Sequence, residues 1–457
     1  MPTTSLLLRS YAAAATTTAS SRGSLSSSGS SGTPPAADEG RAVAHVRRRE
    51  GGPLRVLISG ATVGGLTLAH CLRARGIQAE VVEADSNYDR FVGRSAVVSG
   101  DALRVLQGLG LRSVLEREGT VLAKAVTGLY SGKSIHQQNF EPPTQDQGAG
   151  AVAIPAFALA ELLAESWESR GGRINTSTAI LTMREVAGTG VRCSFRDAKM
   201  GSRDYDLIVL ADGVNSGNTP EVLKEEIYQN PYMTATQVGA YGVWSTYLPR
   251  PFTIAPDQAV DVLGLGSRAG YVPMPEDLLY FWATHRADMA PFLKGGAREA
   301  REWPSVGGGF EKGFSMRTVV QQVEQSDRTC WVHYPRDMRI KQWTHRAGRV
   351  ALLGSGAYST APLPLHEAAL PIEDAAVLAH ALATHPLPAD ALAAYAARRK
   401  PRVEAAQDWA WYLHTQATKT GRWQLALRNF WLTAGPGRLT FARRSSALAR
   451  PLSSSSS

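Results

Sequence analysis

The chain has 457 residues, of which 44% are hydrophobic and 19% charged, an ordinary balance for a soluble globular protein. Its three cysteines, Cys71, Cys193 and Cys330, are scattered and lack metal-site spacing, so they indicate neither a disulfide framework nor a metal site. The net charge of +9 gathers in the two ends of the chain, before Gly52 and after Lys400. A nucleic-acid-binding protein would carry such charge on a folded face, so we expect no nucleic-acid partner.

The first 35 residues are rich in Ser, Thr and Ala and contain two arginines but no acid. This composition is typical of a transit peptide, and equally of a disordered extension that cannot bury enough apolar surface to fold. No run of about 18 apolar residues occurs, so we expect no membrane-spanning helix. The expected location is cytoplasmic, with an organelle as the alternative if the extension is a transit peptide.

Regular structure is predicted to begin near Leu54. Residues 54–58 form a short apolar run that ends just before Gly60, the pattern of a buried parallel strand. A helix is expected over 66–75, closed by Gly76, and a second strand over 78–83. A strand, a helix and a strand within about 30 residues make a βαβ unit.

The remaining pattern divides the chain into an α/β part and a β-rich part. Residues 236–344 are aromatic and β-prone and predict an inserted antiparallel sheet. The other expected elements are helices over 102–109 and 157–169, strands within 176–195 and over 207–211 and 350–353, and helices over 372–383 and 391–411. The domains so interpreted are an extension (1–53), a Rossmann-like domain (54–235 and 345–400, with part of the substrate region in 100–200), a substrate domain (236–344), a basic helical segment (401–450) and a Ser-rich tail (451–457).

A glycine-rich turn, Gly60-Ala61-Thr62-Val63-Gly64-Gly65, lies between the first strand and the first helix. This is the context in which such a turn binds a dinucleotide: the first glycine permits the tight turn and the last lets helix and strand pack closely. The middle glycine, which lets the pyrophosphate approach, is replaced by Thr62, whose side chain is expected to point at that space. Glu83 ends the second strand at the distance typical of an acid that binds ribose.

Three motifs in order, at the usual separations, resemble the FAD-dependent aromatic-hydroxylase type (class A) of flavoprotein monooxygenase. They are residues 60–83, residues 206–216 with Asp212-Gly213, and residues 349–354 followed by 372–375. The resemblance extends over about residues 54–402. It implies an α/β fold, with a Rossmann-like FAD-binding ββα-sandwich domain, an inserted antiparallel β-sheet substrate domain and C-terminal helices.

The resemblance also implies FAD as the cofactor, with NADPH as its reductant only if FAD is bound, and an aromatic or polyketide-like small molecule as the substrate. No metal is implied. The inserted sheet would roof the substrate, and ordinary core packing is the alternative role of its aromatic residues. The cofactor-binding residues so indicated are Gly60, Thr62, Gly64, Gly65, Glu83, Asp212, Gly213, Gly354 and Ser355, and the pocket residues are Tyr241, Trp244, Tyr280 and Trp282.

The sequence departs from the family pattern where FAD should bind. Ala156 replaces an arginine that helps to hold the nucleotide, Ser355 an aspartate, and Thr219 an arginine after the Asp-Gly motif. After Pro362, where the family has a glycine-rich segment against the flavin ring, this chain reads Leu363-Pro364-Leu365-His366-Glu367. Bulk, a negative charge and a residue without an N–H therefore occupy positions where glycines leave room.

These departures predict a retained scaffold with a weak or absent FAD site, used for a redox-neutral step of the cyclase or isomerase type. His366 and Glu367 are the candidate acid/base residues because they would project into the vacated flavin volume; capping of a helix start is the alternative role. A second hypothesis is an active FAD- and NADPH-dependent monooxygenase, a hydroxylase or an epoxidase. A third is a non-enzymatic small-molecule-binding or partner protein.

The C-terminal segment alternates aromatic and basic residues. Trp409, Trp411, Trp423, Phe430 and Trp431 are interspersed with Arg422, Arg428, Arg438, Arg443 and Arg444. A basic helix with aromatic side chains can lie on a membrane surface. The alternative is a helix that packs its apolar stripe on the domain and presents a basic outer face.

Overall fold

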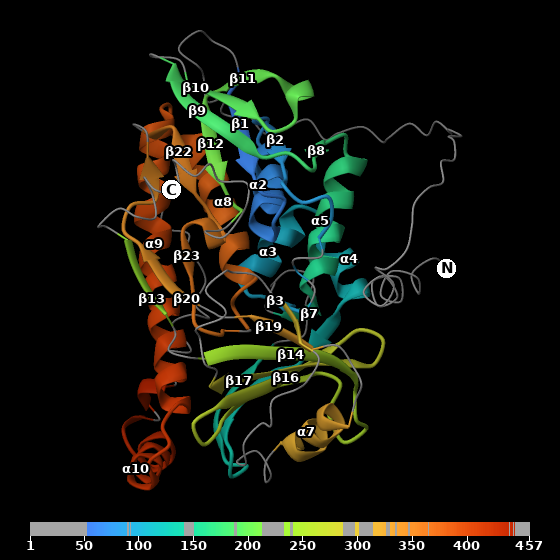
Figure 1. Cartoon of the computed structure of the whole chain (residues 1–457), viewed down its shortest axis with the longest axis vertical. Helices are drawn as coiled ribbons and strands as arrows, with labels where there is room; N and C mark the ends of the chain where they lie inside the picture. The colour runs from blue at the N-terminus through green and yellow to red at the C-terminus, as the bar shows by residue number, and fades with distance from the viewer. Residues whose placement is uncertain are drawn as a thin grey trace. The chain divides into compact units, whose positions relative to one another are not determined.

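A computed structural model describes the protein (Figure 1). The described residues are 53–88, 91, 93–140, 150–186, 190–212, 233–237, 241–286, 298–300, 314–325, 330–333, 336–345, 348–363, 365–437, 439–441 and 443. Contacts divide the chain after Ala42, and every described residue belongs to the second unit, Val43–Ser457.

A six-stranded sheet of order β21-β22-β12-β1-β2-β8 forms the Rossmann-like domain. Its strands are β1 (Arg55–Ser59), β2 (Gln78–Val82), β8 (Ile174–Asn175), β12 (Leu207–Leu210), β21 (Thr344–His345) and β22 (Val350–Leu352). β1 pairs in parallel with both β2 and β12, and only β21 is antiparallel. The apolar runs of β1 and β12 are buried, as expected of parallel strands covered on both faces.

Helices and a small meander cover this sheet. The helix α2 (Val63–Arg73) packs on β1 and β2 and against α5 (Ala156–Ser169) and α8 (Ala369–Thr384). The meander contacts β1 and β12 and consists of β9 (Ile180–Val186), β10 (Gly190–Phe195) and β11 (Ser202–Tyr205). The predicted α/β fold, with a ββα-sandwich of the FAD-binding type, is confirmed.

An eight-stranded sheet of order β18-β19-β14-β17-β16-β15-β5-β6 contains most strands of the region predicted as a substrate domain, and we call it the substrate sheet (Figure 1). Its strands are β5 (Lys124–Leu129), β6 (Ser134–Asn139), β14 (Tyr241–Pro249), β15 (Gln258–Leu263), β16 (Arg268–Met274), β17 (Leu278–Arg286), β18 (Arg298–Ala300) and β19 (Cys330–His333). β5 and β6 come from upstream of the predicted insertion, and β5 pairs in parallel with β15. The helix α7 (Met316–Glu324) packs on one face of this sheet.

Smaller elements connect the two large sheets. One three-stranded sheet contains β3 (Ser95–Ser99), β7 (Ala151–Pro155) and β4 (Thr120–Leu122), and another contains β13 (Met233–Gln237), β20 (Arg336–Ile340) and β23 (Tyr358–Ser359). The helices α3 (Asp101–Gly108) and α4 (Arg112–Glu118) follow β3 in the chain.

The long helix α9 (Pro388–Ala417) is fixed to α8 by a buried ionic cluster. Arg399, which is 0% exposed, donates to Asp374 at 2.5 Å and to Glu373 at 2.7 Å. The helix passes through Pro401, so the boundary predicted at residue 400 falls inside it, and the division into domains stays an interpretation. The helix α10 (Arg422–Thr433) follows α9 in the chain. Within the described ranges, no helix is long and apolar enough to cross a membrane.

Candidate active site

The glycine-rich turn has a backbone that larger residues could not adopt. Gly60 has a φ of +112°, and a Cβ there would lie 2.7 Å from the Cα of Asp212. A Cβ on Gly65 would lie 2.1 Å from the carbonyl oxygen of Gly60. The first and last glycines are therefore required by the tight turn and by the close approach of α2 to β1.

The Thr62 side chain is hydrogen-bonded within the fold. Its hydroxyl caps α2 by accepting from the Gly65 N–H at 3.1 Å and donates to the Ala211 carbonyl at 2.9 Å. The Gly65 N–H is one of the donors that a helix start offers to a phosphate. Because this N–H is bonded to Thr62, the helix start has one fewer donor to offer to a phosphate.

Glu83 is 1% exposed, and its carboxylate faces the backbone of the turn. One oxygen accepts from the Ala61 N–H at 2.8 Å and the other from the Asp85 N–H at 3.0 Å. The predicted ribose-binding acid thus ties the end of β2 to the glycine-rich turn. Asp212 is also buried and lies beside Gly60, whereas Gly213 and Thr219 lie outside the described residues.

The third motif reaches the same place through the 3-10 helix η4 (Gly354–Gly356). Gly354 has a φ of +57°, and a Cβ on it would lie 3.0 Å from the Cβ of Pro371 in α8. A Cβ on Gly64 would touch the same proline at 2.9 Å. The glycines of the first and third motifs therefore converge on the start of α8, with Ser355 exposed beside them.

The segment before α8 forms a closed turn. The Leu363 carbonyl accepts from the N–H groups of His366 and Glu367 at 2.9 and 3.1 Å, and the Glu367 carboxylate accepts from the Leu363 N–H at 3.0 Å. The Leu370 N–H donates to the His366 carbonyl at 3.1 Å. We call residues 362–367 the connecting turn; Pro364 within it lies outside the described residues. The N–H groups of residues 363, 366, 367 and 370 are thus all bonded within the segment.

The two candidate acid/base residues differ in exposure and in their contact with the cavity described below. Glu367 is exposed and caps the turn, and it is not among the described residues that line the cavity below. His366 lines that cavity, and burial lowers its pKa to about 4. The imidazole is therefore neutral at pH 7. Catalysis by either residue stays a prediction.

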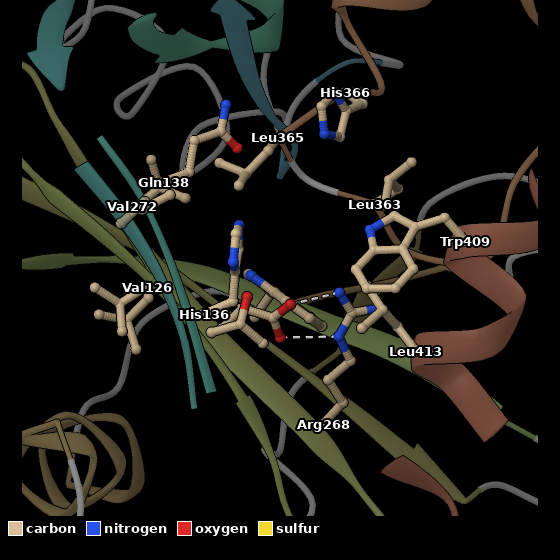
Figure 2. A pocket seen from close by; sticks show the side chains of 16 residues that line it. Val126, His136, Gln138, Arg268, Val272, Leu363, Leu365, His366, Trp409 and Leu413 are labelled. Carbon is tan, nitrogen blue, oxygen red and sulfur yellow. Dashed lines mark hydrogen bonds and ion pairs between the residues drawn. The ribbon is translucent and has the colours of Figure 1, made fainter. Parts of the chain in front are cut away.

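A cavity lies between the connecting turn, the substrate sheet and α9 (Figure 2). Its volume is about 50 Å³, room for a few water molecules, so an aromatic ring enters only when lining side chains move. Burial also lowers the pKa of His136 on β6. The described lining residues are Ala125, Val126, Thr127, His136, Gln138, Ala259, Val260, Asp261, Arg268, Val272, Trp282, Leu363, Leu365, His366, Trp409 and Leu413.

Arg268 connects the substrate sheet to the connecting turn. Its guanidinium donates to both carboxylate oxygens of Asp261, at 2.8 and 2.6 Å (Figure 2). It also donates to the Pro362 carbonyl at 2.6 Å. It also lies over the ring of Trp282, 5.2 Å from the centroid. Arg268 is 1% exposed and is the only arginine or lysine among the described lining residues.

The four predicted roof aromatics do not form one group. Trp282 lines the cavity, and Tyr280 shares its face of the sheet, where its ring lies 5.3 Å from that of Tyr247 and burial raises its pKa. Trp244 pairs with Ala283, which faces the cluster around α7, so the register turns it to the opposite face. The side chain of Tyr241 lies outside the described part of the chain.

Sequence reasoning missed several residues of the cavity. Asp261 and Arg268 lie seven positions apart on adjacent antiparallel strands, and no motif marks them. His136 and Gln138 alternate on β6, a short polar strand whose pairing with β5 only the structure reveals. Trp409 and Leu413 are four residues apart on α9, a helical spacing that indicates a shared face but not what it covers.

Comparisons with known proteins place these observations in a family. Residues 53–253 match the family model described as an FAD binding domain. An FAD-dependent urate hydroxylase of Klebsiella oxytoca is 24% identical over 365 residues, covering 77% of this chain and 87% of the relative. The 3-amino-4-hydroxybenzoate 2-monooxygenase of Streptomyces cremeus is 28% identical over 359 residues (77% and 84%).

The chain is also similar to a relative named as a monooxygenase/isomerase and to a solved structure. The aurachin C monooxygenase/isomerase of Stigmatella aurantiaca is 26% identical over 369 residues, covering 78% of this chain and 87% of the relative. The crystal structure of Klebsiella pneumoniae HpxO with FAD and uric acid has a TM-score of 0.66 and 22% identity, and covers 87% of this chain and 98% of that one. In motifs, fold and relatives, the chain is similar to the FAD-dependent, class A flavoprotein monooxygenases, which are enzymes.

Proposed function

We propose that this protein is an enzyme on the FAD-dependent monooxygenase scaffold that binds FAD weakly or not at all. It would carry out a redox-neutral, cyclase- or isomerase-type step on an aromatic or polyketide-like small molecule. The observation that carries the proposal is the closed connecting turn, in which the Leu363 carbonyl accepts from the N–H groups of His366 and Glu367, and the Glu367 carboxylate accepts from the Leu363 N–H. The family pattern has bare glycines there, whose N–H groups face the flavin ring.

The nucleotide end of the site supports the same proposal. Thr62 and Glu83 are bonded to the turn that would hold the nucleotide, and Ala156 and Ser355 lack the charges of the family's residues. A lost polar contact costs about 1–1.5 kcal/mol, so several together lower affinity by about 10³. The described residues therefore do not fit FAD as the family pattern would.

A redox-neutral isomerisation needs only a group that removes a proton from one atom of the substrate and returns it to another. The neutral imidazole of His366 can accept a proton, and its place on the cavity wall puts it within reach of a ligand there. Apolar walls, which include Leu363, Leu365 and Trp409, would keep water from the reacting atoms. The name of one relative includes both a monooxygenase and an isomerase activity.

The charge of the cavity favours an uncharged ring over an anionic one. Arg268 is the only arginine or lysine among the described lining residues, and the Asp261 carboxylate neutralises it through two hydrogen bonds. A carboxylate on the substrate would lose its hydration without gaining an available cation. We therefore propose a neutral phenol, quinone or lactam as the substrate class.

The second candidate is an active FAD- and NADPH-dependent monooxygenase. It is favoured by the preserved geometry of the glycine-rich turn, where Gly60 and Gly65 keep the close contacts of a dinucleotide-binding fold. In that case the site would hold FAD by the backbone of the turn and by Asp212, and NADPH would reduce it.

The visible absorbance of purified protein, as isolated and after incubation with FAD and gel filtration, separates the two candidates. The first predicts a colourless, folded protein that does not retain FAD. Flavin bands that stay with the protein would overturn it in favour of the monooxygenase.

The substrate class has its own test. In 19F NMR titrations at pH 7, we expect 4-fluorophenol, which is neutral, to bind about tenfold more tightly than 4-fluorobenzoate, an anion of similar size. Asp261→Asn should remove the neutralising carboxylate and raise the affinity for the benzoate alone. Equal binding of the two rings by the wild-type protein would refute the charge argument whatever the state of the flavin.

A further inference from the structure

The helix α10 turns its large apolar side chains away from the protein. Trp423 is 84% exposed, Leu427 68%, Phe430 64% and Trp431 46%. Their spacing of three to four residues places them on one side of the helix. We call these four residues the outer face of α10; Leu439, 66% exposed, follows shortly after.

The opposite side fixes the helix to the domain. Arg428 is 2% exposed and donates to the carbonyls of Gly264 at 2.8 Å and Gln416 at 3.0 Å, and Leu432 is 0% exposed. A helix on a globular domain ordinarily buries its apolar stripe, whereas here a buried arginine and one leucine make the attachment. The outer face is therefore held outward by specific contacts of the helix that carries it.

The charged side chains of the segment that carries the outer face are all positive after Asp408. No aspartate or glutamate follows Asp408, whereas seven lysines and arginines do. Arg422, at the start of α10, is exposed, and Lys419 is half-buried beside it. Exposed tryptophan, phenylalanine and leucine among cations match the chemistry of an anionic lipid surface, where aromatic rings enter the headgroup region and cations meet lipid phosphates.

We propose that the outer face of α10 docks the protein on an anionic membrane surface, with the helix lying in the interface. The segment after Asp408 has no acidic residue that could pair with a basic protein or repel an anionic surface. Its charge therefore favours an anionic lipid surface over a protein partner. Arg428 donates to the Gly264 carbonyl in the loop between β15 and β16. These two strands contribute Asp261 and Arg268 to the cavity. An apolar substrate dissolved in lipid would thus meet the protein near its cavity. The proposal does not depend on the state of the flavin site.

Vesicle flotation of the full-length protein tests this docking. We expect flotation with phosphatidylcholine vesicles that contain phosphatidylserine, little with phosphatidylcholine alone, and release at high salt. The double substitution Trp423→Ser/Phe430→Ser should lower vesicle affinity at least about tenfold, since both side chains would enter the interface. The matched control is Phe252→Ser, because Phe252 is 96% exposed but lies outside this surface.

Three results would overturn the proposal. The wild-type protein could stay in the dense fraction with both kinds of vesicle. The double variant could float like the wild type and the Phe252 control. Light scattering could show a dimer that the double variant converts to a monomer while no vesicle binds, which would assign the outer face to a second copy of the chain.

Discussion

The glycine-rich turn and the connecting turn lie at the two ends of the same expected ligand, and they have changed to different degrees. In the first, Gly60, Gly64 and Gly65 keep the contacts on which the packing of α2 depends. In the second, Leu363 and Glu367 close a hydrogen-bonded turn where the family pattern has glycines. Residues needed by the fold are thus retained, while residues needed mainly by the ligand have been replaced. The difference supports our proposal that this scaffold binds FAD weakly or not at all.

The largest expected effect tests whether the scaffold is stable by itself. Arg399→Met would remove the cation from the buried Asp374 and leave Glu373 paired with Arg402 alone, which should cost about 3–5 kcal/mol of unfolding free energy. Urea denaturation followed by circular dichroism measures it. As a control, Arg192→Met on an exposed Asp204 pair should change little. Equal loss in both variants would mean that the buried cluster is not what fixes α9 to α8.

The glycine-rich turn should be intolerant of a single methyl group. In Gly65→Ala the new Cβ would lie 2.1 Å from the Gly60 carbonyl oxygen, so the turn must shift, at a cost of about 1–3 kcal/mol. Gly108→Ala in α3 is the control, because nothing lies within 4 Å of its Cβ position. Thermal unfolding of both variants should separate them. A Gly65 variant as stable as the Gly108 variant would show that this turn, too, has lost its constraint.

Opening the connecting turn tests whether this turn, more than the glycine-rich turn, limits the affinity for FAD. Leu365→Gly/Glu367→Ala removes bulk and frees the Leu363 N–H, so FAD affinity should rise about tenfold. Retention of FAD after gel filtration, read from visible absorbance, measures the change. Leu387→Gly/Glu404→Ala, which alters an exposed leucine and glutamate elsewhere, should retain no more FAD than the wild type. No gain in the first variant would place the obstacle at the nucleotide end.

The smallest expected effect is a pH dependence of stability that arises from His414 on α9, beside the cavity. Burial lowers the pKa of His414 on α9 to about 4. Between about pH 6.5 and 4 the unfolded chain binds a proton that the folded protein does not, so stability falls as the pH falls through this window. At pH 5 the loss is on the order of 1–2 kcal/mol. The melting temperature of His414→Gln should fall less than that of the wild type between pH 7.5 and 5; parallel curves would contradict this.

Local sequence patterns determined much of this protein. The apolar runs of β1 and β12 predicted buried strands because parallel strands are covered on both faces, and the spacing of glycines predicted the turn before α2. The three ordered motifs predicted the fold and the family. The sequence also showed that residues 363–367 differ from the glycine-rich segment of the family pattern, because each position can be compared with that pattern.

Contacts between distant segments decided the rest, because no local pattern encodes them. Only the structure pairs β5 with β15, turns Trp244 and Trp282 to opposite faces of one sheet, and joins Asp261 to Arg268 at the cavity. The sequence predicted a basic helix with aromatic side chains in the C-terminal segment and left open whether its apolar stripe packs on the domain. The buried guanidinium of Arg428 decides that the large apolar side chains of α10 face outward. Periodicity specifies which residues share a face, whereas the partner of that face depends on how the whole chain packs.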